Sequence, residues 1–154
     1  MYSPAECDAL VALASADLVW VDDLSDSGWV MERLTGAVAA ANRALFGFDI
    51  EDSAESAQIA CYGAERQGHF GWHSDIGDGR LAARRKLTIV AQLSPAGAYD
   101  GGALEIRPSA QTVTADRAQG SVTLFPSYLL HRVTPVTAGA RFSLTLWSHG
   151  PGFR

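Results

Sequence analysis

Residues 130–147 have the sequence LHRVTPVTAGARFSLTLW, in which polar and apolar side chains alternate. Successive side chains of a β-strand point to opposite faces of the sheet. The alternation therefore predicts two strands, Leu130–Thr134 and Arg141–Trp147, with a turn at Thr137–Gly139 between them. In the second strand, apolar side chains share one face, and the other face carries Arg141, Ser143, Thr145 and Trp147.

The chain before this stretch shows the same period-two pattern after Gly47. Turn signals rich in Gly, Pro, Asp and Ser separate the segments. Many short strands at this spacing are typical of a sandwich or a barrel, and a double-sheet jelly roll (a double-stranded β-helix) is the best candidate. The further predicted strands are Gln58–Tyr62, Lys86–Leu93, Ala103–Arg107 and Ser121–Phe125.

The N-terminal third carries helical signals instead. Ser3, Pro4 and Glu6 form a capping pattern that starts a helix running to about Ser15. A short strand is predicted at Leu18–Val21. A second helix is predicted over 29–45, because apolar residues recur at helical spacing and are expected to face the core: Trp29, Leu34, Val38, Ala41 and Leu45.

Together these elements predict a mainly β (α+β) protein, a jelly roll braced by two N-terminal helices. With 154 residues, the chain has the size of one domain. We expect this single domain to span residues 1–154, with helices within about 3–46 and the jelly-roll core at about 57–148.

Composition excludes several function classes. A net charge of −5 provides no overall field for nucleic acid or an anionic membrane. The apolar runs are too short to cross a bilayer, and the N-terminus lacks a basic region followed by an apolar one. Cys7 and Cys61 fit reduced thiols better than a disulfide framework. We therefore expect a cytoplasmic protein with no nucleic-acid or membrane partner; the oligomeric state is not predictable.

His73, Asp75 and His131 are the candidate metal ligands. His73 and Asp75 lie two residues apart in GWHSD, so on an extended chain their side chains point the same way. Two imidazoles and one carboxylate form the facial triad that leaves open positions on non-haem Fe(II), although Zn, Mn, Co or Ni could use the same ligands. A pocket polar enough for such a site would explain the polar faces of several strands, including Thr88 and Gln92.

Two alternatives remain open for these residues. A cupin-like protein could bind a divalent ion at the triad without oxygenase chemistry. A zinc site could instead use His69 and His73, which have i,i+4 spacing. Gly68 and Gly71 make a helix there improbable, so we expect His69, like His149, to be a local or core histidine.

Arg141 is placed to bind an anion near this site. A hairpin centred near Ala138 would put Arg141 opposite Pro135, on the order of 13 Å along the chain from His131. A short dicarboxylate chelating the metal could then reach the guanidinium, whose fixed fork pairs with carboxylates. Ser143 could add a hydroxyl donor, whereas a surface ion pair is the alternative role for Arg141.

Several ordered motifs between Gln58 and Arg154 carry a family resemblance. They are Tyr62, His73-Ser74-Asp75, Arg85–Thr88, Tyr99–Leu104, Phe125–Ser127, and His131-Arg132-Val133 through Arg141. With these motifs the chain resembles the Fe(II)/2-oxoglutarate-dependent dioxygenases, specifically the prolyl-4-hydroxylase-like branch that includes the PKHD-type hydroxylases. The presence of Asp75 argues against the related halogenases, in which a halide replaces that carboxylate.

The resemblance implies a hydroxylase that uses Fe(II), 2-oxoglutarate and O2 and converts 2-oxoglutarate to succinate. His73, Asp75 and His131 would hold iron, and Arg141 would bind the distal carboxylate of the cosubstrate. Tyr62, Ser143 and Gln92 would add cosubstrate contacts, although Gln92 stands where relatives can place a tyrosine. No side chain beyond the metal ligands is required as an acid or a base.

The substrate side of the site is less determined. Arg85, Thr145 and Trp147 are expected to line the substrate pocket, whereas Arg80 and Arg84 could equally be solvated loop charges. Arg132 should point away from His131, and Trp72 could either wall the entrance or fill the core. The family resemblance implies a peptidyl residue as substrate, with proline the first candidate, and a free amino acid or small metabolite is the open alternative.

Overall fold

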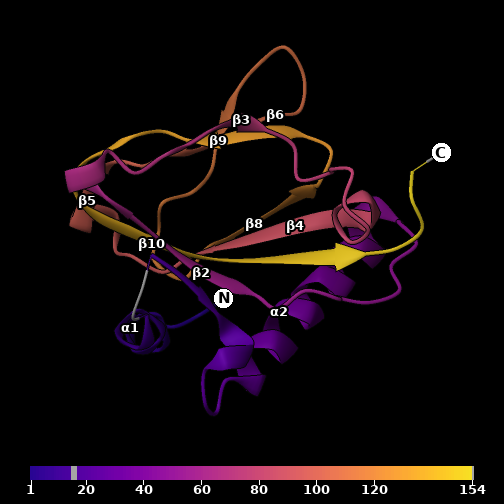
Figure 1. Cartoon of the computed structure of the whole chain (residues 1–154), viewed down its shortest axis with the longest axis horizontal. Helices are drawn as coiled ribbons and strands as arrows, with labels where there is room; N and C mark the ends of the chain where they lie inside the picture. The colour runs from indigo at the N-terminus through magenta and orange to yellow at the C-terminus, as the bar shows by residue number, and fades with distance from the viewer. Residues whose placement is uncertain (15–16, 154) are drawn as a thin grey trace.

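The computed structural model describes residues 1–14 and 17–153, and two antiparallel sheets face each other in it (Figure 1). The larger sheet has the order β1-β2-β10-β4-β8, with β5 paired to one end of β10; the smaller has the order β3-β9-β6-β7. Two facing sheets of antiparallel strands make the jelly roll predicted from the sequence. The strands are β1 Leu18–Trp20, β2 Gln58–Gly63, β3 Phe70–His73, β4 Arg85–Gln92, β5 Tyr99–Gly101, β6 Leu104–Arg107, β7 Val113–Thr114, β8 Val122–Pro126, β9 Leu130–Val133 and β10 Val136–His149.

Helix α1 (Pro4–Leu13) begins as its sequence predicts. The Glu6 amide donates to Ser3 Oγ, the Ser3 amide donates to Glu6 Oε2, and Pro4 occupies the first turn. The helix ends at Leu13, and the predicted end at Ser15 lies outside the described residues. Short 3-10 segments complete the chain at Val21–Asp23, Ala64–Arg66, Ala82–Arg84 and Ala96–Ala98.

Helix α2 (Gly28–Ala41) is followed by a π-helical turn at Asn42–Phe46. Leu34 and Val38 are buried as predicted, but Trp29 is 36% exposed and Leu45 is 77% exposed, so their predicted place in the core is wrong. The wider turn after Ala41 rotates the later residues away from the buried stripe, which explains Leu45. At the start of the helix, Val30 rather than Trp29 is buried.

Both helices lie on the face of the larger sheet that points away from the smaller sheet (Figure 1). There, Leu10 and Leu34 pack against Ile59, Ile89 and Leu144. A smaller apolar cluster lies on the other side of the larger sheet, towards the second sheet. No helix in the described part of the chain is long and apolar enough to span a membrane.

The predicted hairpin between residues 130 and 147 is wrong. Strand β9 pairs with β3 and β6 in the smaller sheet, whereas β10 belongs to the larger sheet, so the chain crosses between sheets at Thr134–Pro135. The predicted turn at Thr137–Gly139 is part of β10 and pairs with β5. Gly139 has φ +69°, and a Cβ there would lie 2.1 Å from Ala98 O. This glycine therefore serves a close approach of two strands instead of a turn.

Candidate metal centre

Strand pairing in the smaller sheet brings the two candidate histidines together. His73 ends β3, and its partner in the register of β9 is His131. Asp75 follows two residues after His73, and its backbone N–H donates to Ser127 O at 2.9 Å. All three side chains therefore meet at one end of the smaller sheet, above the polar face of the larger one.

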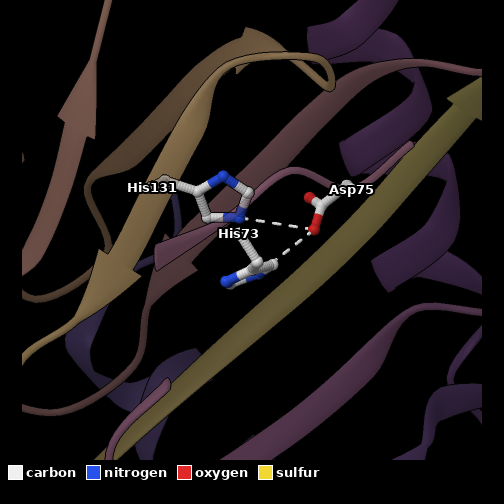
Figure 2. Close-up of side chains that lie close together, drawn as sticks. All are labelled: His73, Asp75 and His131. Carbon is white, nitrogen blue, oxygen red and sulfur yellow. Dashed lines mark ion pairs between the residues drawn. The ribbon is translucent and has the colours of Figure 1, made fainter. Parts of the chain in front are cut away.

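The ligating atoms of these three side chains all lie within 4.8 Å of one another. Asp75 Oδ1 lies 3.4 Å from His73 Nε2 and 3.3 Å from His131 Nε2 (Figure 2). Metal–ligand bonds of about 2.1 Å would place adjacent ligand atoms roughly 3.0–3.4 Å apart. The separations to Asp75 fit a shared ion.

Backbone carbonyls fix the orientation of both imidazoles. His73 Nδ1 lies 2.6 Å from Gly71 O, and His131 Nδ1 lies 2.9 Å from Leu129 O. Because a carbonyl only accepts, each Nδ1 is the donor, which leaves Nε2 of the neutral imidazole with a lone pair for a metal ion. Three acceptor atoms therefore converge on one point, which is the donor set that a divalent transition metal requires.

The second carboxylate oxygen of Asp75 is held by two donors. Oδ2 accepts from Thr88 Oγ1 at 2.7 Å and from Trp147 Nε1 at 3.0 Å. The Ser127 hydroxyl lies 3.0 Å from Thr88 Oγ1, and donates to it because the Thr88 proton goes to Asp75. These contacts leave Oδ1 facing the histidines. The role of Thr88 was not predicted, although its place on the polar face of β4 was the available signal.

The surroundings of the triad keep the Asp75 carboxyl ionised. Burial acts to raise the pKa of the Asp75 carboxyl, but the neighbouring His131 and His73 side chains and the Trp147 N–H outweigh burial and hold that pKa well below its usual range. Burial acts to lower the pKa of His73, but the Asp75 carboxylate and Gly71 O raise it above its ordinary value. An ionised carboxylate between two imidazoles attracts a cation.

A cavity of about 500 Å³ lies between the two sheets and contains the triad. The polar face of β10 forms one wall, as expected for a strand that lines a polar pocket, and it contributes Arg141, Ser143, Thr145 and Trp147. The remaining wall combines polar side chains and aromatic rings with the apolar side chains of Ala60, Val90, Leu104 and Val133. Other lining residues include Gln58, Tyr62, Phe70, Ser74, Arg85 and Thr88.

Arg141 is buried at one end of this cavity, directly opposite Tyr62 in the pairing of β10 and β2. Its guanidinium lies 5.6 Å from the centre of the Tyr62 ring. No carboxylate among the described residues forms an ion pair with it. Burial lowers the pKa of Arg141, while the Tyr62 and Tyr99 hydroxyls act in the opposite direction. A buried guanidinium without an anionic partner is costly, which makes it a natural anion-binding group.

The other candidate cosubstrate residues occupy different positions around Arg141. Tyr62 and Ser143 line the cavity, and burial raises the pKa of the Tyr62 hydroxyl, which keeps it protonated. Gln92 is not among the lining residues of this cavity. It lies behind the guanidinium and accepts a hydrogen bond from Arg141 Nε at 3.1 Å.

Arg85 forms part of the opposite end of the cavity but is already engaged. Its Nε and Nη2 donate to Glu55 at 2.7 and 2.6 Å, and its Nη1 donates to Asp75 O. The guanidinium also lies 3.9 Å from the centre of the Trp147 ring. Glu55 accepts from His149 Nε2 as well, at 2.8 Å. Arg85 therefore shapes the wall and supports Trp147, and its charge is compensated.

Several residues for which the sequence left alternative roles lie outside the cavity. Trp72 packs against the guanidinium groups of Arg107 and Arg132, and Arg132 pairs with Glu105. Trp72 is thus neither an entrance wall nor core. His69 is exposed, and its Nδ1 contacts only Gln67 O among the described residues. His149 is fully buried.

Comparison with known families agrees with this geometry. Residues 57–149 match the model of the 2OG-Fe(II) oxygenase superfamily. A PKHD-type hydroxylase of Hyphomonas neptunium is 42% identical over 81 residues, which cover 51% of this chain and 36% of that protein. Another, from Teredinibacter turnerae, is 28% identical over 91% of this chain and 75% of its own length. This chain therefore spans only about a third of the first of these relatives.

Solved structures share the fold at low sequence identity. A prolyl-4-hydroxylase of Pseudomonas putida has a TM-score of 0.70 and 22% identity, covering 96% of this chain and 84% of that one. The viral collagen prolyl hydroxylase of Paramecium bursaria Chlorella virus-1, solved as a 2OG complex, has a TM-score of 0.71 and 16% identity over 97% and 92% of the two chains. Both are double-stranded β-helix proteins, which confirms the predicted fold class.

Proposed function

Because this chain belongs to the 2OG-Fe(II) oxygenase superfamily, we propose that it is a hydroxylase that uses Fe(II), 2-oxoglutarate and O2. The reaction would hydroxylate an unactivated C–H bond and convert 2-oxoglutarate to succinate. One observation carries this proposal: the triad lines the same cavity as buried Arg141, which has no carboxylate partner among the described residues. A metal-chelating 2-oxo acid with a distal carboxylate has the two functional groups that such a cavity binds.

In this proposal His73, Asp75 and His131 hold the iron. When bound, iron supplies the O2 chemistry that protein side chains lack. Gly71 O and Leu129 O keep both Nε2 atoms directed at the metal position. The hydrogen bonds from Thr88 and Trp147 to Asp75 Oδ2 favour binding through Oδ1 alone, and so leave room for other ligands.

The cosubstrate end of the cavity would be organised by Arg141. Its fixed fork of N–H donors matches a carboxylate, and the low dielectric of the interior strengthens the contact. Tyr62 and Ser143 lie on the wall beside it and can donate hydroxyl hydrogens to the same ligand. No side chain in the cavity is assigned proton transfer.

The substrate would enter at the end lined by Thr145, Trp147 and Arg85. Gln58, Ser74 and Thr145 offer uncharged polar contacts there. A peptidyl residue such as proline is the first candidate, supported by the names of the structural neighbours; a free amino acid or small metabolite is the second. The free thiols Cys7 and Cys61 support a reducing, cytoplasmic location.

Succinate formation tests the proposal directly. Protein supplied with Fe(II), 2-oxoglutarate and O2 should form succinate and CO2, and a substrate should increase the rate. Asp75→Ala should lose this activity because it removes one of the three metal ligands. If the wild-type protein binds a divalent ion yet forms no succinate across broad pools of peptides and metabolites, a cupin-like metal-binding role replaces the proposal.

A further inference from the structure

A chain of hydrogen bonds leads from Arg141 away from the cavity. Arg141 Nε donates to Gln92 Oε1 at 3.1 Å, and Gln92 Nε2 donates to the Tyr99 hydroxyl at 2.9 Å and to Ser94 O at 3.2 Å. A guanidinium can only donate and a carbonyl can only accept, so the orientation of the Gln92 amide is determined. This series of hydrogen bonds therefore connects strands β10, β4 and β5.

Tyr99 is itself firmly held. Its side chain is buried, and the Arg117 guanidinium lies 4.3 Å from the centre of its ring. Arg117 also donates to Tyr99 O at 3.0 Å and to Gly101 O at 2.8 Å. Gly139, which pairs with Tyr99, allows this segment to approach β10 two residues before Arg141. The Tyr99 hydroxyl is thus a fixed point relative to the guanidinium.

The neutral side chain at position 92 has an electrostatic consequence. Arg141 is held by an amide oxygen, and no carboxylate among the described residues pairs with it. An amide orients the guanidinium without cancelling its charge, whereas a carboxylate at the same place would form a buried ion pair. Since neither Gln92 nor Tyr99 lines the 500 Å³ cavity, both act on a ligand through Arg141.

We propose that Tyr99, acting through Gln92, is a positioning residue for Arg141, and that the neutral amide at position 92 keeps the charge of Arg141 available to the distal carboxylate of 2-oxoglutarate. This inference rests on the proposed function. It predicts that the Tyr99 hydroxyl, which lies outside the cavity, contributes to the affinity for 2-oxoglutarate. It also predicts that Gln92 affects this affinity through Arg141 and does not contact 2-oxoglutarate.

Calorimetric titration of 2-oxoglutarate into Mn(II)-loaded protein tests the inference. Tyr99→Phe removes only the hydroxyl and should weaken 2-oxoglutarate binding by about threefold to tenfold, the size of one hydrogen bond. Gln92→Glu keeps the shape but adds a charge, and should weaken binding at least about tenfold. Tyr128→Phe, at an exposed tyrosine, should bind as the wild type does. Mn(II) affinity, titrated separately, should be unchanged in all three variants.

The outcomes separate this inference from the function on which it rests. If the wild type binds 2-oxoglutarate and Tyr99→Phe binds it equally well, the positioning role is overturned while the proposed function stands. The role is also overturned if Tyr99→Phe loses Mn(II) affinity by the same factor, because the effect is then a general disturbance of the fold. If the wild-type protein itself binds no 2-oxoglutarate, the proposed function is wrong, and the inference that rests on it is wrong as well.

Discussion

Single hydrogen bonds decide how Asp75 can act as a ligand. Its two oxygens have separate tasks: Oδ2 accepts from Thr88 and Trp147, and Oδ1 faces the two imidazoles. A carboxylate that lost one of these donors could rotate and use both oxygens on the metal. Groups that orient metal ligands are typically worth about 10–100-fold in metal affinity.

At the scale of single residues, we expect Thr88→Val to weaken Mn(II) binding by about tenfold or more. Valine has nearly the shape of threonine but cannot donate to Asp75 Oδ2, and it also leaves the Ser127 hydroxyl without its acceptor. Thr145→Val, which changes another threonine of the same cavity with no hydrogen bond to Asp75, is the matched control. Equal Mn(II) affinities for the two variants, measured by calorimetry, would show that Thr88 does not orient the ligand.

At the scale of elements, short segments fix the ends of the sheets and helices. The missing Cβ of Gly139 lets β5 approach β10 closely, and helix α1 starts at a complete capping box. Both features are local in the sequence, yet each links distant parts of the chain: Glu6 of α1 also pairs with Arg33 of α2 at 2.7 Å.

Gly139→Ala should destabilise the protein by about 2–3 kcal/mol, because alanine disfavours the positive φ and its Cβ would meet Ala98 O. The free energy of unfolding in urea measures this. Gly97→Ala, in the same segment, places its Cβ in open space and should change stability little. A Gly139→Ala protein as stable as the wild type would contradict the close approach of β5 to β10.

The Glu6–Arg33 pair gives a pH dependence with a defined sign. Hydrogen bonds from Arg33 and the Ser3 amide lower the pKa of Glu6 from 4.5 to about 2. The stabilisation is therefore complete above pH 4.5 and lost as the pH falls through about 2. Glutamine at this position can still cap the helix, so the Glu6→Gln variant should differ most from the wild type near neutral pH.

The measurement is the difference in free energy of unfolding between the wild type and Glu6→Gln across this range. We expect a small difference in the free energy of unfolding, because both side chains are partly exposed. This difference should decrease as the pH falls from 4.5 towards 2. The difference between the wild type and Arg33→Met should decrease over the same pH range, since this variant removes the other charge of the pair. A difference that is constant with pH would assign the effect to the helix cap and not to the ion pair.

Sequence patterns predicted most elements, but not which elements pair. Period-two alternation located β2, β4, β6, β8 and β9, whereas the turn signal of Gly139 hid the start of β10 and led to the wrong hairpin. Strand β3 is short and contains Gly71, so it lacked a clear strand pattern. The contact of Thr88 with Asp75 depends on the register that sets Trp147 opposite Thr88, which no local pattern encodes.

At the scale of the whole molecule, the cavity that contains the triad lies between the larger sheet and the smaller sheet. The helices cover the other face of the larger sheet, so one face of that sheet packs in the core and the other lines the cavity that contains the triad. The sequence indicated this division by alternating Arg141, Ser143 and Thr145 with Phe142, Leu144 and Leu146. His73 and His131 lie together because β3 pairs with β9. The ligand types predicted that these histidines share a metal, but no local pattern predicted this pairing.

The most direct test of the account is whether 2-oxoglutarate binding depends on the metal. One cavity with a metal at the triad and Arg141 at the far end should bind one 2-oxoglutarate per chain. Calorimetry with Mn(II) present should show this binding, and chelation of the metal should abolish most of it. Equal binding with and without Mn(II), or in Asp75→Ala protein, would contradict a shared site for metal and 2-oxoglutarate.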